Sequence, residues 1–141
     1  VNSVTADPPT ILICTNNSTG TSKMIDDSGW FAVNFLSMSQ RSVSDVFAGA
    51  GGLQGDVRFS EGEWDVGGFH QLPLLNGALA HLECQVERVV KAGTHNVYFG
   101  RVQSAQVEAG EPLIYYGGSY LPAASNCASK LNQCDVQTTK A

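Results

Sequence analysis

The feature that most constrains the fold is a stretch in which apolar and polar side chains alternate with a period of two residues. A short turn and a second long strand-like segment follow it. Within residues 78–87, small or apolar side chains occupy every other position: Ala78, Ala80, Leu82, Cys84 and Val86. The intervening positions are mostly polar, Glu83 among them, which predicts a strand with one buried face and one wet face. A turn at residues 91–94 then returns the chain along residues 95–107. The sequence therefore predicts a long antiparallel hairpin.

Three shorter segments also have strand character. Residues 10–15 are apolar at successive positions, which predicts a central strand buried on both faces. Residues 30–36 are rich in aromatic and β-branched side chains, and three of them share one face: Phe31, Val33 and Phe35. Residues 113–116 predict a last short strand.

Two segments show helical signals instead. A short helix is expected over residues 22–28, with Gly29 as its left-handed stop. The spacing of Val43, Val46 and Phe47 predicts a second helix of two to three turns that ends at Gly49. The glycine-rich residues 49–68 should be irregular, with aromatic anchors at Phe59, Trp64 and Phe69.

These elements predict a mainly β fold, a small barrel or sandwich whose opening two short helices cover. The 141 residues fit one domain, which we place at residues 1–121, followed by a polar tail at residues 122–141. The net charge of −5 disfavours nucleic-acid binding. The apolar runs are too short for a membrane span, and the sparse cysteines and the lack of a signal-peptide pattern indicate the cytoplasm.

The best candidate site from the residues alone is the polar loop at residues 15–22. Its residues are all hydroxyl, amide or glycine, and the helix start that follows presents free backbone N–H groups. Such a loop can bind phosphate without net positive charge. The alternative is an ordinary solvated turn whose serine or threonine only caps the helix.

Other candidates are less specific. His95 follows a turn and could reach a ligand over the rim of a barrel, or be a partly exposed structural residue. The tyrosines and glycines of residues 115–120 could contact a planar ligand, or form an edge strand and a turn. His70, His81 and the two tail cysteines lack metal-ligand spacing, so we expect no metal site. The sequence has neither a GxGxxG motif opening a βαβ unit nor a P-loop.

Taken in order along residues 1–120, a series of short motifs resembles the flavin reductase family. They include Asp7 to Asn16, Ser28 to Leu36, Gln40 to Gly49, Arg58-Phe59, Leu75 to Ala80, Leu82 to Cys84, Gly93 to His95, Phe99 to Val102 and Pro112 to Tyr116. The resemblance implies an FMN-binding split β-barrel, usually a homodimer, that oxidises NADH or NADPH and passes reduced FMN or FAD to a separate monooxygenase.

The resemblance also implies positions for the two ligands. Flavin contacts are expected at Asn2, Ser3, Val4, Thr5, Cys14, Thr15, Asn16, Ser18, Thr19, Gly20, Thr21, Val46 and Phe47. Nicotinamide-nucleotide contacts are expected at His95, Tyr115, Tyr116, Gly117 and Gly118. The phosphate loop proposed from the residues thus coincides with the loop that the family pattern assigns to the flavin phosphate.

The chain departs from the family pattern in three places. The family's first helix and first barrel strands have no counterpart before Val1. Residues 1–5 resemble the family's Val-Asn-Ser-Phe-Thr, with about three residues absent before Asp7, whereas an alignment without a gap sets residues 2–5 on the family's Thr-Ser-Val-Ser. Thr94 replaces an aspartate that often precedes the histidine, and Gly117 replaces an arginine.

The expected reaction is hydride transfer between the two cofactors, which requires no acid or base from the protein. Two alternatives stay open. One is a barrel that binds flavin or another small ligand without catalysis, and the other is an incomplete domain that binds nothing without its partner subunit.

Overall fold

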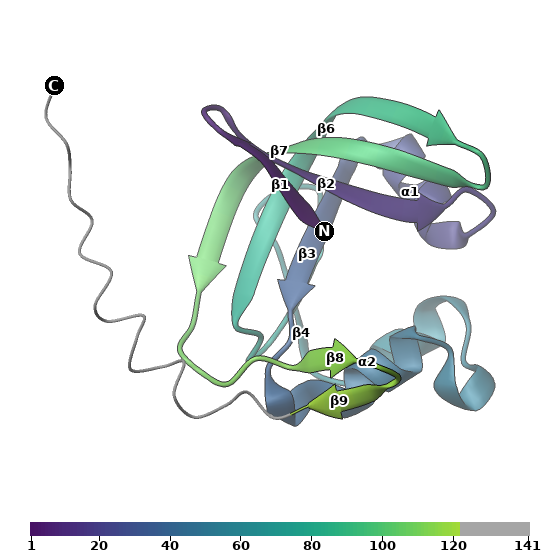
Figure 1. Cartoon of the computed structure of the whole chain (residues 1–141), viewed down its shortest axis with the longest axis vertical. Helices are drawn as coiled ribbons and strands as arrows, with labels where there is room; N and C mark the ends of the chain where they lie inside the picture. Colours follow the sequence, from purple (N-terminus) through teal and green to yellow (C-terminus); the bar gives the residue numbers. More distant parts are fainter. Residues whose placement is uncertain (122–141) are drawn as a thin grey trace, which may run out of the picture.

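The computed structural model describes residues 1–121 and centres on one five-stranded antiparallel sheet with the order β1-β2-β7-β6-β3. The long β6–β7 hairpin curves through the length of the molecule (Figure 1). The strands are β1 (Asn2–Ala6), β2 (Pro9–Asn16), β3 (Trp30–Phe35), β6 (Ala80–Ala92) and β7 (His95–Val107). Consecutive pairing of β1 with β2 and of β6 with β7 needs only short turns, as antiparallel strands allow.

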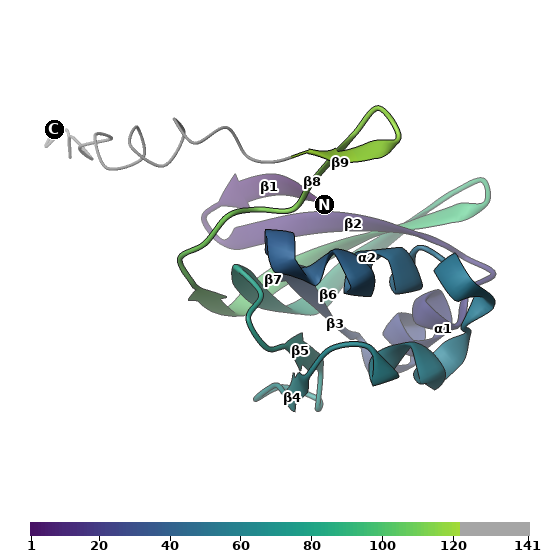
Figure 2. The ribbon, with the colours of Figure 1, turned by 90° about the horizontal axis from the view of Figure 1, so that it is seen from below.

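Short helices and two small hairpins complete the fold. Figure 2 shows α2 lying between the β8–β9 hairpin and the β4–β5 hairpin, whereas α1 lies apart from α2, toward the right of the view. The helices are α1 (Gly20–Ser28), η1 (Met38–Gln40), α2 (Arg41–Phe47), η2 (Ala50–Gly52) and η3 (Gly55–Ser60). The small strands are β4 (Trp64–Val66), β5 (Pro73–Leu75), β8 (Ile114–Tyr116) and β9 (Ser119–Leu121).

The buried apolar side chains form two clusters rather than one. The larger cluster lies between α1 and the sheet and contains Ile11, Ile25, Phe31, Cys84 and Tyr98. The smaller cluster lies beside α2 and contains Val43, Leu75 and Ala78. Because α1 and α2 are anchored to different clusters, a space lined by both helices can form between them.

Most of the predicted elements are confirmed. The hairpin, the strands and both helices occur where the residue patterns placed them, and Gly29 ends α1 with a φ of 73°. Positive φ is accessible to glycine at little cost, which is why the helix stops there. The aromatic anchors Phe59 and Trp64 both pack against Phe47. The predicted tail at residues 122–141 lies outside the described residues.

Two burial predictions are wrong. Glu83, expected on the wet face of β6, is only 5% exposed because residues 67–72 fold over it and the Phe69 N–H donates to its Oε2 at 3.0 Å. A bulge between Glu83 and Cys84 also shifts the register. The strand β2, expected to be buried on both faces, is buried only at Thr10 and Ile11, and Cys14 is exposed. None of the helices among residues 1–121 combines the length and the apolar character that crossing a bilayer requires.

Candidate functional site

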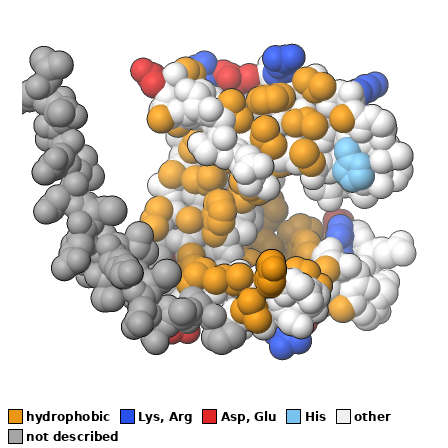
Figure 3. Space-filling model, in the orientation of Figure 1, with side chains coloured by type: hydrophobic (Ala, Val, Ile, Leu, Met, Phe, Trp, Pro, Cys, Tyr) orange, Lys and Arg blue, Asp and Glu red, His pale blue; other side chains and the backbone are white. Residues whose placement is uncertain are grey.

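A cleft of about 550 Å³ lies between α1 and β3 on one side and α2 and η3 on the other. Figure 3 shows hydrophobic side chains deep in a hollow between the two halves of the molecule, with charged side chains at its edge. The aromatic residues in the lining are Trp30, Phe31, Phe47, Phe59 and Trp64. Its volume falls within the range of about 300–1,000 Å³ that is typical of small-molecule sites.

One wall of the cleft is a packed trio of aromatic rings. The centroids of Phe47 and Phe59 lie 5.2 Å apart, and those of Phe59 and Trp64 lie 5.0 Å apart, both with edge-to-face geometry. The indole N–H of Trp64 donates to the Glu61 carbonyl at 2.9 Å, which fixes the ring. This wall is a rigid aromatic surface, against which a planar aromatic ligand can pack.

Opposite this wall, Trp30 stacks on two neighbouring rings. Its centroid lies 5.0 Å from that of Phe69 and 5.0 Å from that of His70. His70 and Gln71 both have positive φ, 47° and 54°, although neither is glycine. Such backbone strain persists only where the surroundings enforce it. Here the buried carboxylate of Glu83 holds the segment in place through the Phe69 N–H.

The polar loop reaches the cleft with only part of its length. The Asn16 Oδ1 accepts hydrogen bonds from the Ser18 N–H at 2.9 Å and the Ser18 hydroxyl at 2.8 Å. The Thr19 hydroxyl donates to the Asn16 carbonyl at 2.7 Å and accepts the Ser22 N–H as the N-cap of α1. These hydroxyls therefore stabilise the loop itself. Their hydrogen-bond donors are engaged within the loop and are not directed to a ligand.

Gly20 and Thr21 are different, because both line the cleft. Within the described residues, neither backbone N–H has a hydrogen-bond partner. They are the first two helical residues of α1, whose N-terminus carries partial positive charge. Two open N–H donors thus border the cleft at a helix start, an arrangement that favours an anion.

A guanidinium adds positive charge to the opposite side of the cleft. The Arg58 Nε donates to the Gly55 carbonyl at 3.2 Å, and the guanidinium lies 5.2 Å from the Phe47 ring centroid. Among residues 1–121 the ion pairs are Arg41 with Asp45 and Arg101 with Glu87, so Arg58 is not neutralised by a close carboxylate. Asp56 also lines the cleft. The charge of Arg58 is therefore available to a ligand.

The structure brings some of the predicted flavin residues together and separates others. Gly20, Thr21 and Phe47 line the cleft, with Ser18 and Thr19 just before it in the loop and Val46 beside it on α2. Cys14 is exposed, whereas its neighbour Ile13 lines the cleft, so the two side chains project from opposite faces of β2.

The remaining predicted flavin residues lie along the sheet. Asn2, Ser3, Val4 and Thr5 are all exposed in β1, which pairs with β2 alone among the strands of residues 1–121. Asn16 ends β2, and the neighbouring Thr15 has a buried Oγ1 with no hydrogen-bond partner in the described residues. None of these side chains lines the cleft.

The predicted nicotinamide residues fall in two places. His95 begins β7 directly across from Asn16, and its Nδ1 is 2.9 Å from the Thr94 hydroxyl. Tyr115, Tyr116, Gly117 and Gly118 form the exposed end of the β8–β9 hairpin. That hairpin is anchored to α2, because the Tyr120 hydroxyl donates to Asp45 Oδ1 at 2.9 Å. His95 therefore adjoins the phosphate loop, while the tyrosines adjoin α2.

Sequence reasoning missed several residues of the cleft. Arg58 had a usable signal, since it is a cation in a glycine-rich segment of an acidic chain. Trp30 and His70 had none, because their stacking depends on the fold of residues 67–72. A buried hydrogen-bond network around Tyr98 was also missed, since it joins residues more than 70 positions apart.

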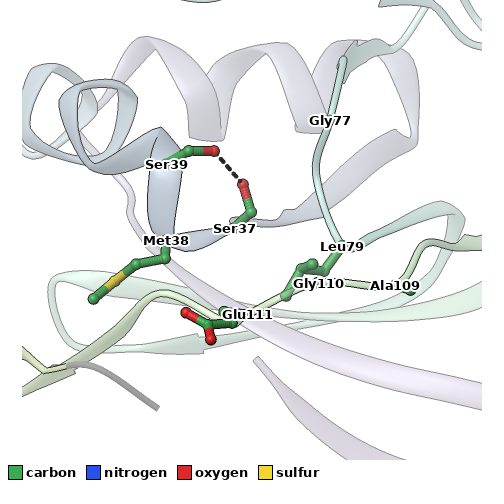
Figure 4. A pocket seen from close by; sticks show the side chains of 8 residues that line it. All are labelled: Ser37, Met38, Ser39, Gly77, Leu79, Ala109, Gly110 and Glu111. Carbon is green, nitrogen blue, oxygen red and sulfur yellow. Dashed lines mark hydrogen bonds between the residues drawn. The ribbon is translucent and has the colours of Figure 1, made fainter. Parts of the chain in front are cut away.

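A second, smaller pocket of about 360 Å³ lies beside η1 (Figure 4). The Ser37 and Ser39 hydroxyl oxygens lie 3.0 Å apart on one side of this pocket, and Glu111 lies on the other side. It contains none of the residues predicted to bind flavin or nicotinamide. Its shallow polar lining lacks the aromatic surface of the larger cleft.

The cysteine in the larger core cluster has no catalytic character. Cys84 is fully buried in that cluster. Burial first, and the neighbouring Glu83 carboxylate second, raise the pKa of its thiol to about 11. A thiol that stays protonated is a poor nucleophile, so Cys84 is a packing residue.

Comparisons with known proteins agree with this architecture. The flavin reductase-like domain matches residues 1–124. The FMN reductase (NADH) RutF of Pseudomonas syringae is 34% identical over 129 residues, covering 89% of this chain and 71% of that protein. The reductase component of 4-hydroxyphenylacetate 3-monooxygenase from Pseudomonas aeruginosa is 35% identical over 119 residues, covering 84% of this chain and 69% of that protein.

A solved structure shows the same likeness. The NADH:FAD oxidoreductase SgcE6 of Streptomyces globisporus, in complex with NAD and FAD fragments, superposes with a TM-score of 0.80 at 28% identity. The match covers 89% of this chain and 74% of that one. The predicted mainly β split barrel and the stated resemblance are both confirmed. The chain belongs to the family built on the flavin reductase-like domain.

Proposed function

We propose that this protein is a flavin reductase that oxidises NADH and reduces FMN. The observation that carries the proposal is the aromatic cleft bordered by the open N–H groups of Gly20 and Thr21. The relatives named as NADH-dependent FMN or FAD reductases support the same reaction. We propose FMN rather than FAD as the flavin, because the single phosphate of FMN matches the one pair of open backbone donors at Gly20 and Thr21.

The residues present fit a flavin mononucleotide. The tricyclic ring needs apolar aromatic surface, which Trp30 and the Phe47–Phe59–Trp64 wall supply. The phosphate needs donors in a chain of net charge −5, which Gly20 and Thr21 supply at the start of α1. Arg58 adds a cation at the same cleft. The other predicted flavin contacts, in β1 and at Cys14, stay predictions.

The protein's part in the reaction is positioning. When both ligands are bound, the reduced nicotinamide supplies a hydride that the flavin accepts. The aromatic walls orient a flat ring and exclude water from its faces, and orientation of this kind can contribute several kcal/mol. His95, beside the phosphate loop, is proposed to contact the nicotinamide nucleotide. No side chain has to gain or lose a proton.

The proposal extends to partners. Because a relative is the reductase component of 4-hydroxyphenylacetate 3-monooxygenase, we propose that reduced flavin leaves this protein for a separate monooxygenase. Residues 1–121 are proposed as the functional domain. The homodimer implied by the resemblance stays a prediction, which light scattering of the purified protein checks.

The experiment is steady-state oxidation of NADH with and without added FMN, followed by the nicotinamide absorbance. We expect turnover that saturates with FMN and stops when FMN is omitted. A Trp64→Ala variant should raise the KM for FMN, whereas a Val107→Ala variant at the exposed end of β7 should not. FMN binding without NADH oxidation would identify a flavin-binding barrel instead, and no binding would refute the cleft assignment.

A further inference from the structure

A buried polar network joins helix α1 to strand β7. The Ser22 Oγ and the Tyr98 hydroxyl lie 2.7 Å apart, and both side chains are 0% exposed. The Asn96 Nδ2 lies 3.1 Å from the Ser22 Oγ and 3.0 Å from the Tyr98 hydroxyl, and Asn96 is 4% exposed. The Tyr98 hydroxyl also lies 2.8 Å from Asp26 Oδ1. Three buried polar side chains, Ser22, Asn96 and Tyr98, are thus joined beside the larger core cluster, and Tyr98 links them to the exposed Asp26.

The hydrogen bonds of this network can be assigned donors and acceptors in one consistent way. Asn96 has two amide hydrogens, which it donates to Ser22 and to Tyr98. The Ser22 hydroxyl then donates to the Tyr98 oxygen, and the single Tyr98 hydrogen is donated to the Asp26 carboxylate. A hydrogen bond to a carboxylate is stronger than a neutral one, so the chain of donors is stabilised at its end.

The network holds one face of α1. Ser22 and Asp26 are four residues apart and lie one above the other on the helix surface, and the Tyr98 hydroxyl contacts both. The only other buried side chain of α1 is Ile25. An apolar contact at a single residue tolerates some rotation of the helix, whereas directed hydrogen bonds to two successive turns do not. Tyr98 therefore fixes how α1 is rotated.

We propose that Tyr98 is a positioning residue that makes this barrel selective for a phosphorylated flavin. By holding Ser22, it orients the preceding Gly20 and Thr21 so that their open N–H groups face the cleft. This inference rests on the proposed function, because it assigns the phosphate of FMN to those donors. The hydroxyl itself is buried and acts only through α1.

The test compares the affinities for FMN and for riboflavin, which differ by the phosphate alone. Binding is followed by tryptophan fluorescence, since both tryptophans of the chain, Trp30 and Trp64, line the cleft. The Tyr98→Phe variant should weaken FMN binding about tenfold and change riboflavin binding less than twofold. Ile25→Val is the matched control, because it weakens the docking of the same helix without removing a hydrogen bond.

Each outcome of these titrations either supports or overturns the role proposed for Tyr98. Loss of the preference for FMN in Tyr98→Phe, with the preference kept in Ile25→Val, supports the proposal. An unchanged preference in Tyr98→Phe, or an equal loss in both variants, overturns it while leaving the proposed function intact. If the wild-type protein binds neither flavin, the proposed function itself fails. Should Tyr98→Phe not fold, Ser22→Ala removes the same tether with a smaller change and is judged by the same ratio.

Discussion

Replacing Gly20 by proline would remove one of the two open N–H donors with little disturbance to the fold. Gly20 is the first residue of α1, the helical position where proline is most readily accepted. The preceding Thr19 has φ −88° and ψ 153°, the extended conformation that a residue before proline prefers. A Cβ at Gly20 would meet no atom within 4 Å. The substitution is therefore compatible with the structure.

The effects on stability and on binding should have opposite signs. Gly20→Pro and the control Gly20→Ala both restrict the unfolded chain, and each should be neutral or stabilising by about 0.4–1 kcal/mol. Only the proline removes the N–H. A hydrogen bond to a charged group contributes about 1.5–3 kcal/mol, so its loss should weaken FMN binding about ten- to hundredfold. The alanine variant should bind FMN as the wild type does.

The assay is an FMN titration followed by tryptophan fluorescence, with thermal unfolding measured on the same samples. The expected result is a proline variant at least as heat-stable as the alanine variant but with a much larger Kd for FMN. Equal Kd values in the two variants would refute the assignment of the flavin phosphate to the start of α1. A proline variant that unfolds earlier than wild type would refute the description of Gly20 as a free helix start.

Three further predictions concern the core residues Gly100 and Cys84 and the cleft residue Arg58. Gly100→Ala should destabilise the protein by about 1–3 kcal/mol in chemical denaturation, because its Cβ would overlap the Phe31 ring; an unchanged midpoint would contradict the packing of the core. Cys84, with its pKa raised to about 11, should favour folding below the pH at which a free thiol ionises, near 9, and that contribution should be lost as the pH rises from 9 to 11. A Cys84→Ala variant, which lacks the thiol, should lose less stability over that interval. Arg58→Gln should raise the KM for FMN with little change in melting temperature, and an unchanged KM would exclude Arg58 from the site.

The local pattern of apolar and polar residues was sufficient to predict the strands and helices, but not to predict which side chains are buried. The alternation in residues 78–87 identified β6 because one face of that strand packs on the core. The same alternation put Glu83 in water, and it failed there because the covering segment, residues 67–72, belongs to a glycine-rich stretch without periodicity. Burial of this kind depends on a contact between distant segments, and no local period encodes it.

The candidate site shows the same division. The composition of the polar loop was enough to predict a binding site there, and Gly20 and Thr21 do border the cleft. Its hydroxyls could not be assigned from sequence, since Ser18 and Thr19 turn out to hold the loop together. In the opposite wall, Phe47 was expected from the family resemblance to contact flavin, whereas Phe59 and Trp64 were expected only as core anchors. That these rings share a cleft with α1 follows from the packing of α1 and α2 on separate clusters.

The most direct test of the central claim is to mix the protein and FMN with NADH in the absence of oxygen and record the flavin absorbance. If the cleft holds flavin for hydride transfer, the yellow absorbance should bleach at a rate that rises with protein concentration, in step with the loss of reduced nicotinamide. Flavin that stays oxidised, or that bleaches no faster than without the protein, would contradict the account.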